Sequence, residues 1–403
     1  MFQVEEPIFY FKSSEKMEEI EDKSIQLIVT SPPYGKIKNY GISDQIGFTD
    51  SFEEYFRRLK KVWEECFRVL EPQCRLVVNI GDQYLRTTEF GRYRILPIAS
   101  RIIKDCLDIG FDFLGDLIWQ KISTTNTTGG CSLMGSIYYP RNGLLTFDYE
   151  HVLIFKKHQG KKKKIDLKTK ELSKIPLSEW KKWYIGHWRF PGIVQKEHIA
   201  MFPEELPYRL IRMFSFIGDT VLDPFVGSGT TLKIAKALFR KGVGYEINTE
   251  FHPIIQEKLK EAHIGYFKDY QYLLYILFTK SQGSNDFKIL YQEQRKKGII
   301  ALQNGNDKKI ILDYLAIETI NPNNEELKKE VTAKLEENTV QNYLNEKPNW
   351  EKFSNYIIIV NSIKAVFQKI QDYFKKHESK KLIQIIQFRE ILAEDFDFAN
   401  LFI

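Results

Sequence analysis

Apolar runs and helically spaced apolar residues alternate along the first 250 residues of the chain. Short runs rich in branched residues, each closed by a turn signal, predict buried strands over 25–30, 75–80, 113–120, 149–156, 220–222 and 242–246. Between them, apolar residues recur every three or four positions and predict helices over 52–70, 95–109, 206–216 and 230–239. Strands separated by helices of this length favour an α/β fold with a doubly wound, mostly parallel sheet.

The pattern changes after residue 280. Residues 281–286 are polar and glycine-containing, as in a linker, and a second break occurs at 321–324. Helically spaced apolar residues over 363–374 predict an amphipathic helix. The sequence therefore predicts a catalytic domain over 1–280 and an α-rich accessory region over 281–403.

Composition narrows the class of protein. With 403 residues, 43% of them hydrophobic, the chain is long enough to bury one large core or two. It has no apolar run of roughly 18 residues, and its N-terminus lacks the layout of a secretory signal, so we expect a cytoplasmic protein without membrane spans. Four cysteines without a C-x-x-C pair or a nearby histidine predict reduced thiols and no metal site.

The positive charge of the chain is concentrated in one segment. The formal net charge is +6, whereas residues 157–182 alone carry ten lysines against three acidic residues, a local net charge of +7. A concentrated positive field suits a polyanionic partner such as nucleic acid. The alternative for the lysine run 161–164 is the solvated tip of a hairpin.

A proline-rich tetrapeptide, Ser31-Pro32-Pro33-Tyr34, directly follows the apolar run 25–30. Two consecutive prolines stiffen the turn, since each fixes its own φ angle. The Ser31 hydroxyl and the Pro32 carbonyl are acceptors suited to hold the two N–H bonds of an exocyclic amino group, so that the nitrogen lone pair is localised. Tyr34 offers a flat face on which a base flipped out of a duplex can stack. Taken alone, the tetrapeptide is equally compatible with a plain strand-to-turn junction.

A second motif, the glycine-bearing loop 223–231, lies between a predicted strand and a predicted helix. Gly227 and Gly229 allow a ligand to approach the backbone closely, and the N-terminus of the following helix offers free N–H groups to a carboxylate. Glu246 ends the next strand, where an acidic side chain can hold two ribose hydroxyls. Further polar contacts are expected from Asp223, Thr230 and Thr231.

The two motifs, in this order, resemble the DNA amino-methyltransferases of restriction-modification systems, in the permuted branch called beta. The resemblance covers about residues 20–265 and implies a circularly permuted methyltransferase sheet that binds S-adenosylmethionine. It implies catalytic roles for Ser31, Pro32, Pro33 and Tyr34. It implies cofactor contacts for Asp223, Phe225, Gly227, Gly229, Thr230, Thr231 and Glu246 and, within the segment 198–206, for Phe202.

In the resembled branch, the target-recognition region lies between the strand 149–156 and the segment 198–206, here about residues 157–197. This region contains the lysine surplus together with tryptophans, a mixture suited to phosphate and base contacts. The predicted DNA-binding residues are Lys161, Lys162, Lys163, Lys164, Trp183, Trp188 and Arg189. Two alternatives remain open, because the tryptophans could instead pack a small core and residues 123–142 are a second candidate for DNA contact.

The sequence thus predicts an enzyme that transfers methyl from S-adenosylmethionine to the N4 amino group of cytosine in duplex DNA. In the resembled family S-P-P-Y usually accompanies N4-cytosine methylation, whereas D-P-P-Y more often accompanies N6-adenine methylation, the nearest alternative. A restriction endonuclease is the expected functional partner, and the chain is expected to be a monomer or a homodimer. Rival hypotheses are a catalytically inactive DNA-binding subunit and a methyltransferase fused to a nuclease in 281–403.

Overall fold

The computed structural model divides the chain into two compact units, Gln3–His263 and a second one that contains Ile264–Ile403. The structure describes residues 5–35, 44–122, 143–193 except 162 and 176, 202–260, the single positions 42, 134, 135, 141 and 262, and five C-terminal strands. The predicted domain boundary near residue 280 lies outside the described residues and stays a prediction.

The first unit is built on an eight-stranded sheet with the strand order β1-β12-β11-β2-β3-β9-β6-β10. Its neighbouring strands are parallel except where β9 runs antiparallel to β3 and β6. The strands are β1 (Ile8–Tyr10), β2 (Ile25–Thr30), β3 (Leu70–Ile80), β6 (Asp112–Ile122), β9 (Tyr149–Lys156), β10 (His187–Pro191), β11 (Thr220–Asp223) and β12 (Lys241–Tyr245). This mostly parallel sheet confirms the predicted fold class.

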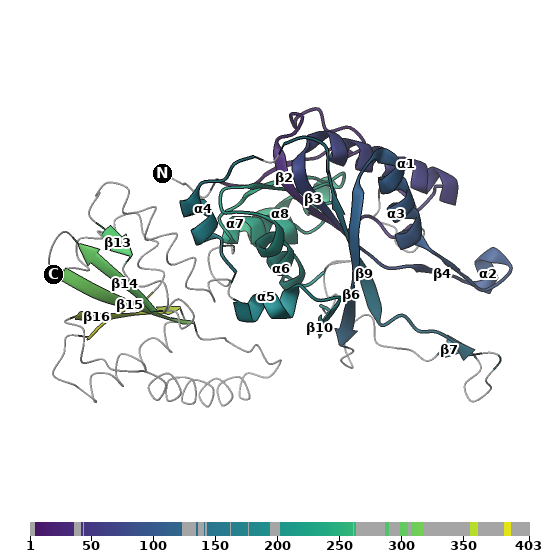
Figure 1. Cartoon of the computed structure of the whole chain (residues 1–403). Helices are drawn as coiled ribbons and strands as arrows, with labels where there is room; N and C mark the ends of the chain where they lie inside the picture. Colours follow the sequence, from purple (N-terminus) through teal and green to yellow (C-terminus); the bar gives the residue numbers. More distant parts are fainter. Residues whose placement is uncertain are drawn as a thin grey trace. The chain divides into compact units, whose positions relative to one another are not determined.

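Helices cover both faces of the sheet (Figure 1). The helix pair α1 (Phe52–Val69) and α3 (Ile98–Ile109) covers one face, and α6 (Glu205–Phe214), α7 (Thr230–Ala237) and α8 (His252–Lys260) cover the other. Two shorter helices, α4 (Leu167–Leu172) and α5 (Leu177–Trp183), precede β10. The largest core cluster joins the apolar stripe of α1 to the strands beneath it, where Leu59, Val62 and Trp63 are fully buried. No helix within the described residues is long and apolar enough to cross a membrane.

The chain leaves two adjacent central strands in opposite directions. From β2 it passes through α1 to β3 on one side, and from β11 through α7 to β12 on the other. Strands β2 and β11 are themselves paired, with Leu27 opposite Val221. In an open α/β sheet, ligands bind outside the carboxyl ends of the strands at such a switch point.

Two small hairpins extend from the carboxyl edge of the sheet. Strands β4 (Gln83–Leu85) and β5 (Arg94–Leu96) flank the short helix α2 (Thr87–Phe90), and β7 (Met134–Gly135) pairs with β8 (Gly143–Leu144). The predicted helix 95–109 begins only at Ile98, because Pro97 follows β5 and stands at the helix N-cap. Strands β1 and β10 were not predicted, since both are short edge strands.

The described part of the second unit consists of strands. A five-stranded sheet has the order β13-β14-β15-β16-β17, antiparallel from β13 to β15 and parallel from β15 to β17. Its strands are β13 (Phe287–Ile289), β14 (Ile299–Asn304), β15 (Lys308–Ala316), β16 (Asn355–Asn361) and β17 (Ile383–Gln387). These five strands were not predicted, and isoleucine-rich runs such as those of β14 to β17 favour strands. The α-rich character expected for the region as a whole stays a prediction. The helix predicted over 363–374 lies outside the described residues.

Lys157 is a buried structural cation rather than part of a basic surface. Its ammonium group donates hydrogen bonds to the carbonyl oxygens of Phe67 and Leu70, the latter at 2.8 Å, at the C-terminal end of α1. The side chain is 4% exposed, and burial lowers the pKa of its ammonium group. It therefore satisfies helix-end carbonyls that have no partner within the helix.

We expect Lys157→Met to lower the free energy of unfolding by about 2 kcal/mol, because buried carbonyls lose their charged donor. Urea denaturation of the variant and of the neighbouring Lys156→Met, a less buried control, measures the effect. Equal stability of both variants would show that the cap contributes nothing.

Candidate functional site

One cavity lies at the switch point between β2 and β11. The space between its lining atoms amounts to about 970 Å³, with the open mouth included. Its lining includes the whole tetrapeptide, Ser31, Pro32, Pro33 and Tyr34. It also includes Phe202, Phe225, Gly227, Thr230 and Glu246, from segments that are distant in sequence. The structure therefore brings both sequence motifs to one cavity.

The tetrapeptide turn is held from the protein side through its third residue. The Pro33 carbonyl accepts hydrogen bonds from the hydroxyl of Tyr55, at 2.7 Å, and from the backbone N–H of Gly35, at 3.0 Å. Tyr55 is fully buried on α1, so the turn is fixed to the core. Among the described residues, none donates a hydrogen bond to the Ser31 hydroxyl or the Pro32 carbonyl. Two acceptors at the cavity are thus available to a ligand.

Glu246 fixes the glycine loop and faces the cavity. Its carboxylate accepts hydrogen bonds from the backbone N–H groups of Gly227 and Asn248, both at 2.8 Å. Burial raises the pKa of the Glu246 carboxyl, and these backbone hydrogen bonds oppose that rise. A carboxylate accepts about four hydrogen bonds, so acceptor capacity remains for hydroxyl groups of a ligand.

Three predicted cofactor residues lie beneath the loop and do not line the cavity. Asp223 is 1% exposed; its carboxylate accepts hydrogen bonds from the Thr30 hydroxyl, at 2.7 Å, and from the Phe225 N–H, at 3.0 Å. Burial raises the pKa of its carboxyl, and the Thr30 hydrogen bond opposes this. Gly229 has φ +86° and packs against Ile255, and Thr231 is 1% exposed. Neighbouring protein atoms cover all three residues, which support the loop from beneath, and direct cofactor contact stays a prediction for them.

A row of interacting polar side chains, which the sequence did not predict, lies beside Tyr34. A Cβ atom built on Gly81 would lie 3.4 Å from the Tyr34 ring and 3.5 Å from Cγ of Glu150. The Glu150 carboxylate accepts a hydrogen bond from the Asn79 side-chain amide, at 2.6 Å, and pairs with Lys121. The Asn79 side-chain oxygen is buried and has no partner among the described residues. These polar groups lie on three different strands, so only sheet pairing reveals them.

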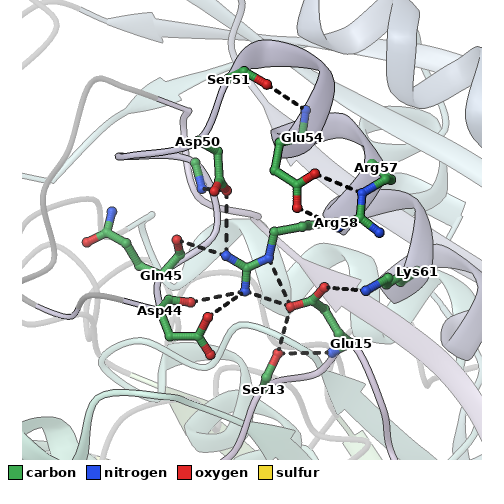
Figure 2. A network of polar contacts seen from close by, with 11 residues as sticks. Ser13, Glu15, Asp44, Gln45, Asp50, Ser51, Glu54, Arg57, Arg58 and Lys61 are labelled. Carbon is green, nitrogen blue, oxygen red and sulfur yellow. Dashed lines mark hydrogen bonds and ion pairs between the residues drawn. The ribbon is translucent and has the colours of Figure 1, made fainter.

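Arg58 holds two segments of the cavity wall in place (Figure 2). Its guanidinium pairs with Glu15 at 2.6 Å and with Asp44 at 3.1 Å, and it donates a hydrogen bond to the Gln45 carbonyl. Asp44 and Gln45 line the cavity, and Glu15 directly follows two further lining residues. Only 9% of Arg58 is exposed, so the network fixes the wall from within the protein.

A histidine–aspartate pair, His151 and Asp116, joins strands β9 and β6. Nδ1 of His151 lies 2.7 Å from Oδ2 of Asp116, and this contact raises the pKa of the imidazole above its usual value. The contribution to stability is complete below about pH 6.5, the pKa of an unfolded histidine, and is lost as the pH rises through the raised pKa.

We therefore expect Asp116→Asn to lower the free energy of unfolding by about 1 kcal/mol at pH 6 and by much less at pH 9. Urea denaturation at both values measures this. Asp112→Asn is the control, because Asp112 lies on the same strand as Asp116, and its own histidine partner, His158 at 3.5 Å, is exposed. A pH-independent loss in Asp116→Asn would contradict the ionic origin of the contribution.

The described lysines of the run 161–164 lie at the opposite edge of the sheet from the cavity. Lys163 pairs with Glu71 at 3.4 Å, and Gly160 packs against Pro72, both at the amino end of β3. The cavity lies at the carboxyl end of that strand, and ten residues span about 33 Å at the usual strand rise. The antiparallel strand β9 carries the chain away from the cavity toward these lysines. Contact of Lys161, Lys163 and Lys164 with DNA stays a prediction. Lys162 lies outside the described residues.

The two predicted tryptophans belong to a core. Trp183 is 5% and Trp188 is 1% exposed, and the Trp188 indole donates a hydrogen bond to the Trp183 carbonyl. This burial favours the alternative that these tryptophans pack a small core, and DNA contact stays a prediction for both. Arg189 is exposed on β10, opposite Gln120 near the carboxyl end of β6. Most of the second candidate, 123–142, lies outside the described residues, although both of its flanks lie at the carboxyl edge.

Comparisons of the sequence with a family model and with known proteins agree on one family. Residues 25–257 match a family model of N6/N4 methyltransferases described as DNA methylase. Type II methyltransferase M.MjaI of Methanocaldococcus jannaschii is 37% identical, over 63% of this chain and 92% of that protein. Type II methyltransferase M.MthZI of Methanothermobacter thermautotrophicus is 34% identical, over 63% of this chain and 76% of that protein.

A solved structure has the same fold. A protein of Thermus thermophilus, named as a putative DNA modification methylase and complexed with S-adenosyl-L-methionine, is 30% identical to this chain. The TM-score is 0.53, and the match covers 64% of this chain and 96% of that one.

Proposed function

The chain belongs to the DNA methylase family of N6/N4 methyltransferases, and from this premise we propose that it methylates the N4 amino group of cytosine in duplex DNA. The observation that carries the proposal is the meeting of the tetrapeptide and the glycine loop at one cavity. S-adenosylmethionine is the cofactor, and it supplies an electrophilic methyl group when bound. The residues present fit it, because Glu246 offers acceptors for hydroxyl groups and the cavity has space for the remainder.

The chain's own residues prepare the amino nitrogen. The target base leaves the duplex, because its amino group is otherwise paired, and stacks on Tyr34. The Ser31 hydroxyl oxygen and the Pro32 carbonyl oxygen accept hydrogen bonds from the two N–H groups of the base. The lone pair of the amino nitrogen is then localised toward the methyl donor. No strong base is required, since the nitrogen is positively charged once it has taken the methyl group, and its acidic proton then passes to water. The Tyr55 hydrogen bond to the Pro33 carbonyl keeps this turn rigid during the transfer.

Cytosine is proposed over adenine because serine stands at the first position of the tetrapeptide, as in the N4-cytosine type that the motif resembles. The same machinery would serve N6-adenine methylation, which remains the second candidate within this family. The intact tetrapeptide and glycine loop argue against an inactive DNA-binding subunit. Titration with S-adenosylmethionine separates an active enzyme from that alternative.

The test is to incubate the protein with unmethylated plasmid and S-adenosylmethionine, digest the DNA and identify the methylated nucleoside by mass. N4-methylcytosine is the expected product. N6-methyladenine would overturn the choice of base and leave the family intact. No methylated nucleoside, with S-adenosylmethionine still bound, would overturn the proposed substrate.

We further propose that the enzyme acts in the cytoplasm, where its DNA substrate lies, and protects that DNA from a partner restriction endonuclease. A catalytic domain up to about residue 280 and an accessory role for 281–403 belong to the same proposal. Cleavage of plasmid DNA by the full chain with Mg²⁺ would favour a nuclease in the second unit instead.

A further inference from the structure

The arginines of the first unit fall into two groups. Most are bound within the protein, by ion pairs, ring contacts or backbone carbonyls: Arg57, Arg58, Arg68, Arg75, Arg101, Arg209, Arg212 and Arg240. Five are exposed and have no partner among the described residues: Arg86, Arg92, Arg94, Arg141 and Arg189. Three members of the second group belong to residues 83–96, which we call the β4–β5 arm.

The β4–β5 arm is rooted beside the tetrapeptide. Its first residue, Gln83, is 4% exposed, and its side-chain oxygen lies 2.7 Å from where a Cβ atom of Gly35 would stand. Gly35 directly follows Tyr34 in the chain. Just before the arm, the Asp82 carboxylate accepts a hydrogen bond from the backbone N–H of Ala99, at 3.0 Å, in the first turn of α3. The root therefore has a fixed position next to the tetrapeptide, which lines the cavity.

The rest of the arm is braced against its neighbours and projects from the sheet (Figure 1). The Tyr84 hydroxyl donates a hydrogen bond to the Leu145 carbonyl, at 3.0 Å, and accepts one from the Phe147 N–H, at 2.6 Å. At the tip, the Phe90 ring stacks on Phe52 at the start of α1, with ring centroids 5.5 Å apart. These contacts fix the backbone from which the arginines extend.

The arm carries a local net charge of +2, three arginines against Glu89. A guanidinium is planar and binds phosphate through two parallel hydrogen bonds. The three guanidinium groups of the arm form no ion pair with a described residue and are exposed. A flipped base in the cavity would bring its own strand, with its phosphates, to the cavity mouth. The charge of the arm, its position beside the tetrapeptide and its fixed backbone thus all favour a DNA phosphate backbone as the partner.

We propose that the β4–β5 arm binds the phosphate backbone of duplex DNA beside the flipped base, through Arg86, Arg92 and Arg94. The inference rests on the proposed function, since it assumes that duplex DNA is the substrate. Phosphate contacts fix the register of a protein on the duplex and carry no sequence information directly. The arm therefore contributes affinity and position, and sequence is read elsewhere.

The test compares two triple variants of the full chain that remove equal charge. Arg86→Gln, Arg92→Gln and Arg94→Gln neutralise the arm. Lys23→Gln, Lys241→Gln and Lys260→Gln form the control, because these exposed lysines lie outside residues 157–197, just before β2, at the amino end of β12 and at the end of α8. Duplex binding is measured by fluorescence anisotropy over a range of NaCl concentrations with a non-reactive cofactor analogue present, and S-adenosylmethionine binding is measured by calorimetry.

The arm variant is expected to bind DNA at least about tenfold more weakly at moderate salt, with the slope of log K against log salt reduced by about 2.7 for three lost phosphate contacts. Its affinity for S-adenosylmethionine is expected to stay unchanged, which excludes misfolding. An unchanged salt slope, or an equal loss in the control, would overturn the inference. Wild-type protein that binds cofactor but neither binds nor methylates DNA would instead overturn the proposed function.

Discussion

Tyr34→Ala is expected to lower the turnover of methyl transfer about hundredfold at saturating S-adenosylmethionine. The ring lies at the cavity wall beside the acceptors of Ser31 and Pro32, so its loss leaves the flipped base without a stacking surface. The Kd for S-adenosylmethionine should change less than about twofold, because the glycine loop on the other side of the cavity is untouched. Single-turnover assays with labelled methyl donor, together with calorimetry, measure both quantities.

Tyr34→Phe is the matched control, since it keeps the ring and removes only the hydroxyl. We expect it to retain most of the turnover. If Tyr34→Ala transferred methyl at the wild-type rate, the stacking role would be wrong. If the phenylalanine variant failed equally, the hydroxyl rather than the ring would be the functional group.

Glu246→Ala is expected to raise the Kd for S-adenosylmethionine about hundredfold. Two hydrogen bonds to a charged acceptor contribute about 3 kcal/mol together, and the variant also frees the backbone N–H of Gly227 that now fixes the loop. Turnover at saturating cofactor should fall far less than affinity, because the tetrapeptide remains in place. Calorimetry and initial rates over a range of cofactor concentrations give the two values.

Glu250→Gln is the control for this experiment. Glu250 is exposed four residues further along the chain, so its change removes the same charge without touching the cavity. Wild-type affinity is expected. A Glu246→Ala variant that binds cofactor normally would remove Glu246 from the cofactor site.

Elements with a clear period and clear stop signals were predicted closely from sequence. Strands β2 and β9 have the predicted bounds, and α1 ends one residue before the predicted end. The Ser51 hydroxyl caps the start of α1, and the alternation of strand and helix leads directly to a mostly parallel sheet. The tetrapeptide and the glycine loop follow predicted strands, so local signals also indicated that both lie at one edge.

The surface proposed to face DNA could not be predicted in the same way. The sequence of a lysine run shows its charge but not the end of the sheet at which it lies. That end depends on the antiparallel direction of β9. Buried Trp188 and exposed Arg189 are adjacent in the same strand, and only the packing of β10 against α6 distinguishes them. The contacts that link Asn79, Glu150 and Lys121 depend on the register of three strands. No local sequence pattern predicts that register.

The hydrogen bond from Thr30 to Asp223 joins residues that are 193 positions apart. During synthesis at about 5–20 residues per second, β2 leaves the ribosome about 10–40 s before its partner β11 exists. One edge of this apolar central strand stays unpaired in the nascent chain for that interval, and unpaired edges promote aggregation. The protein should therefore depend on chaperones while it is being made, and no nascent chain that ends before β12 should be able to methylate anything.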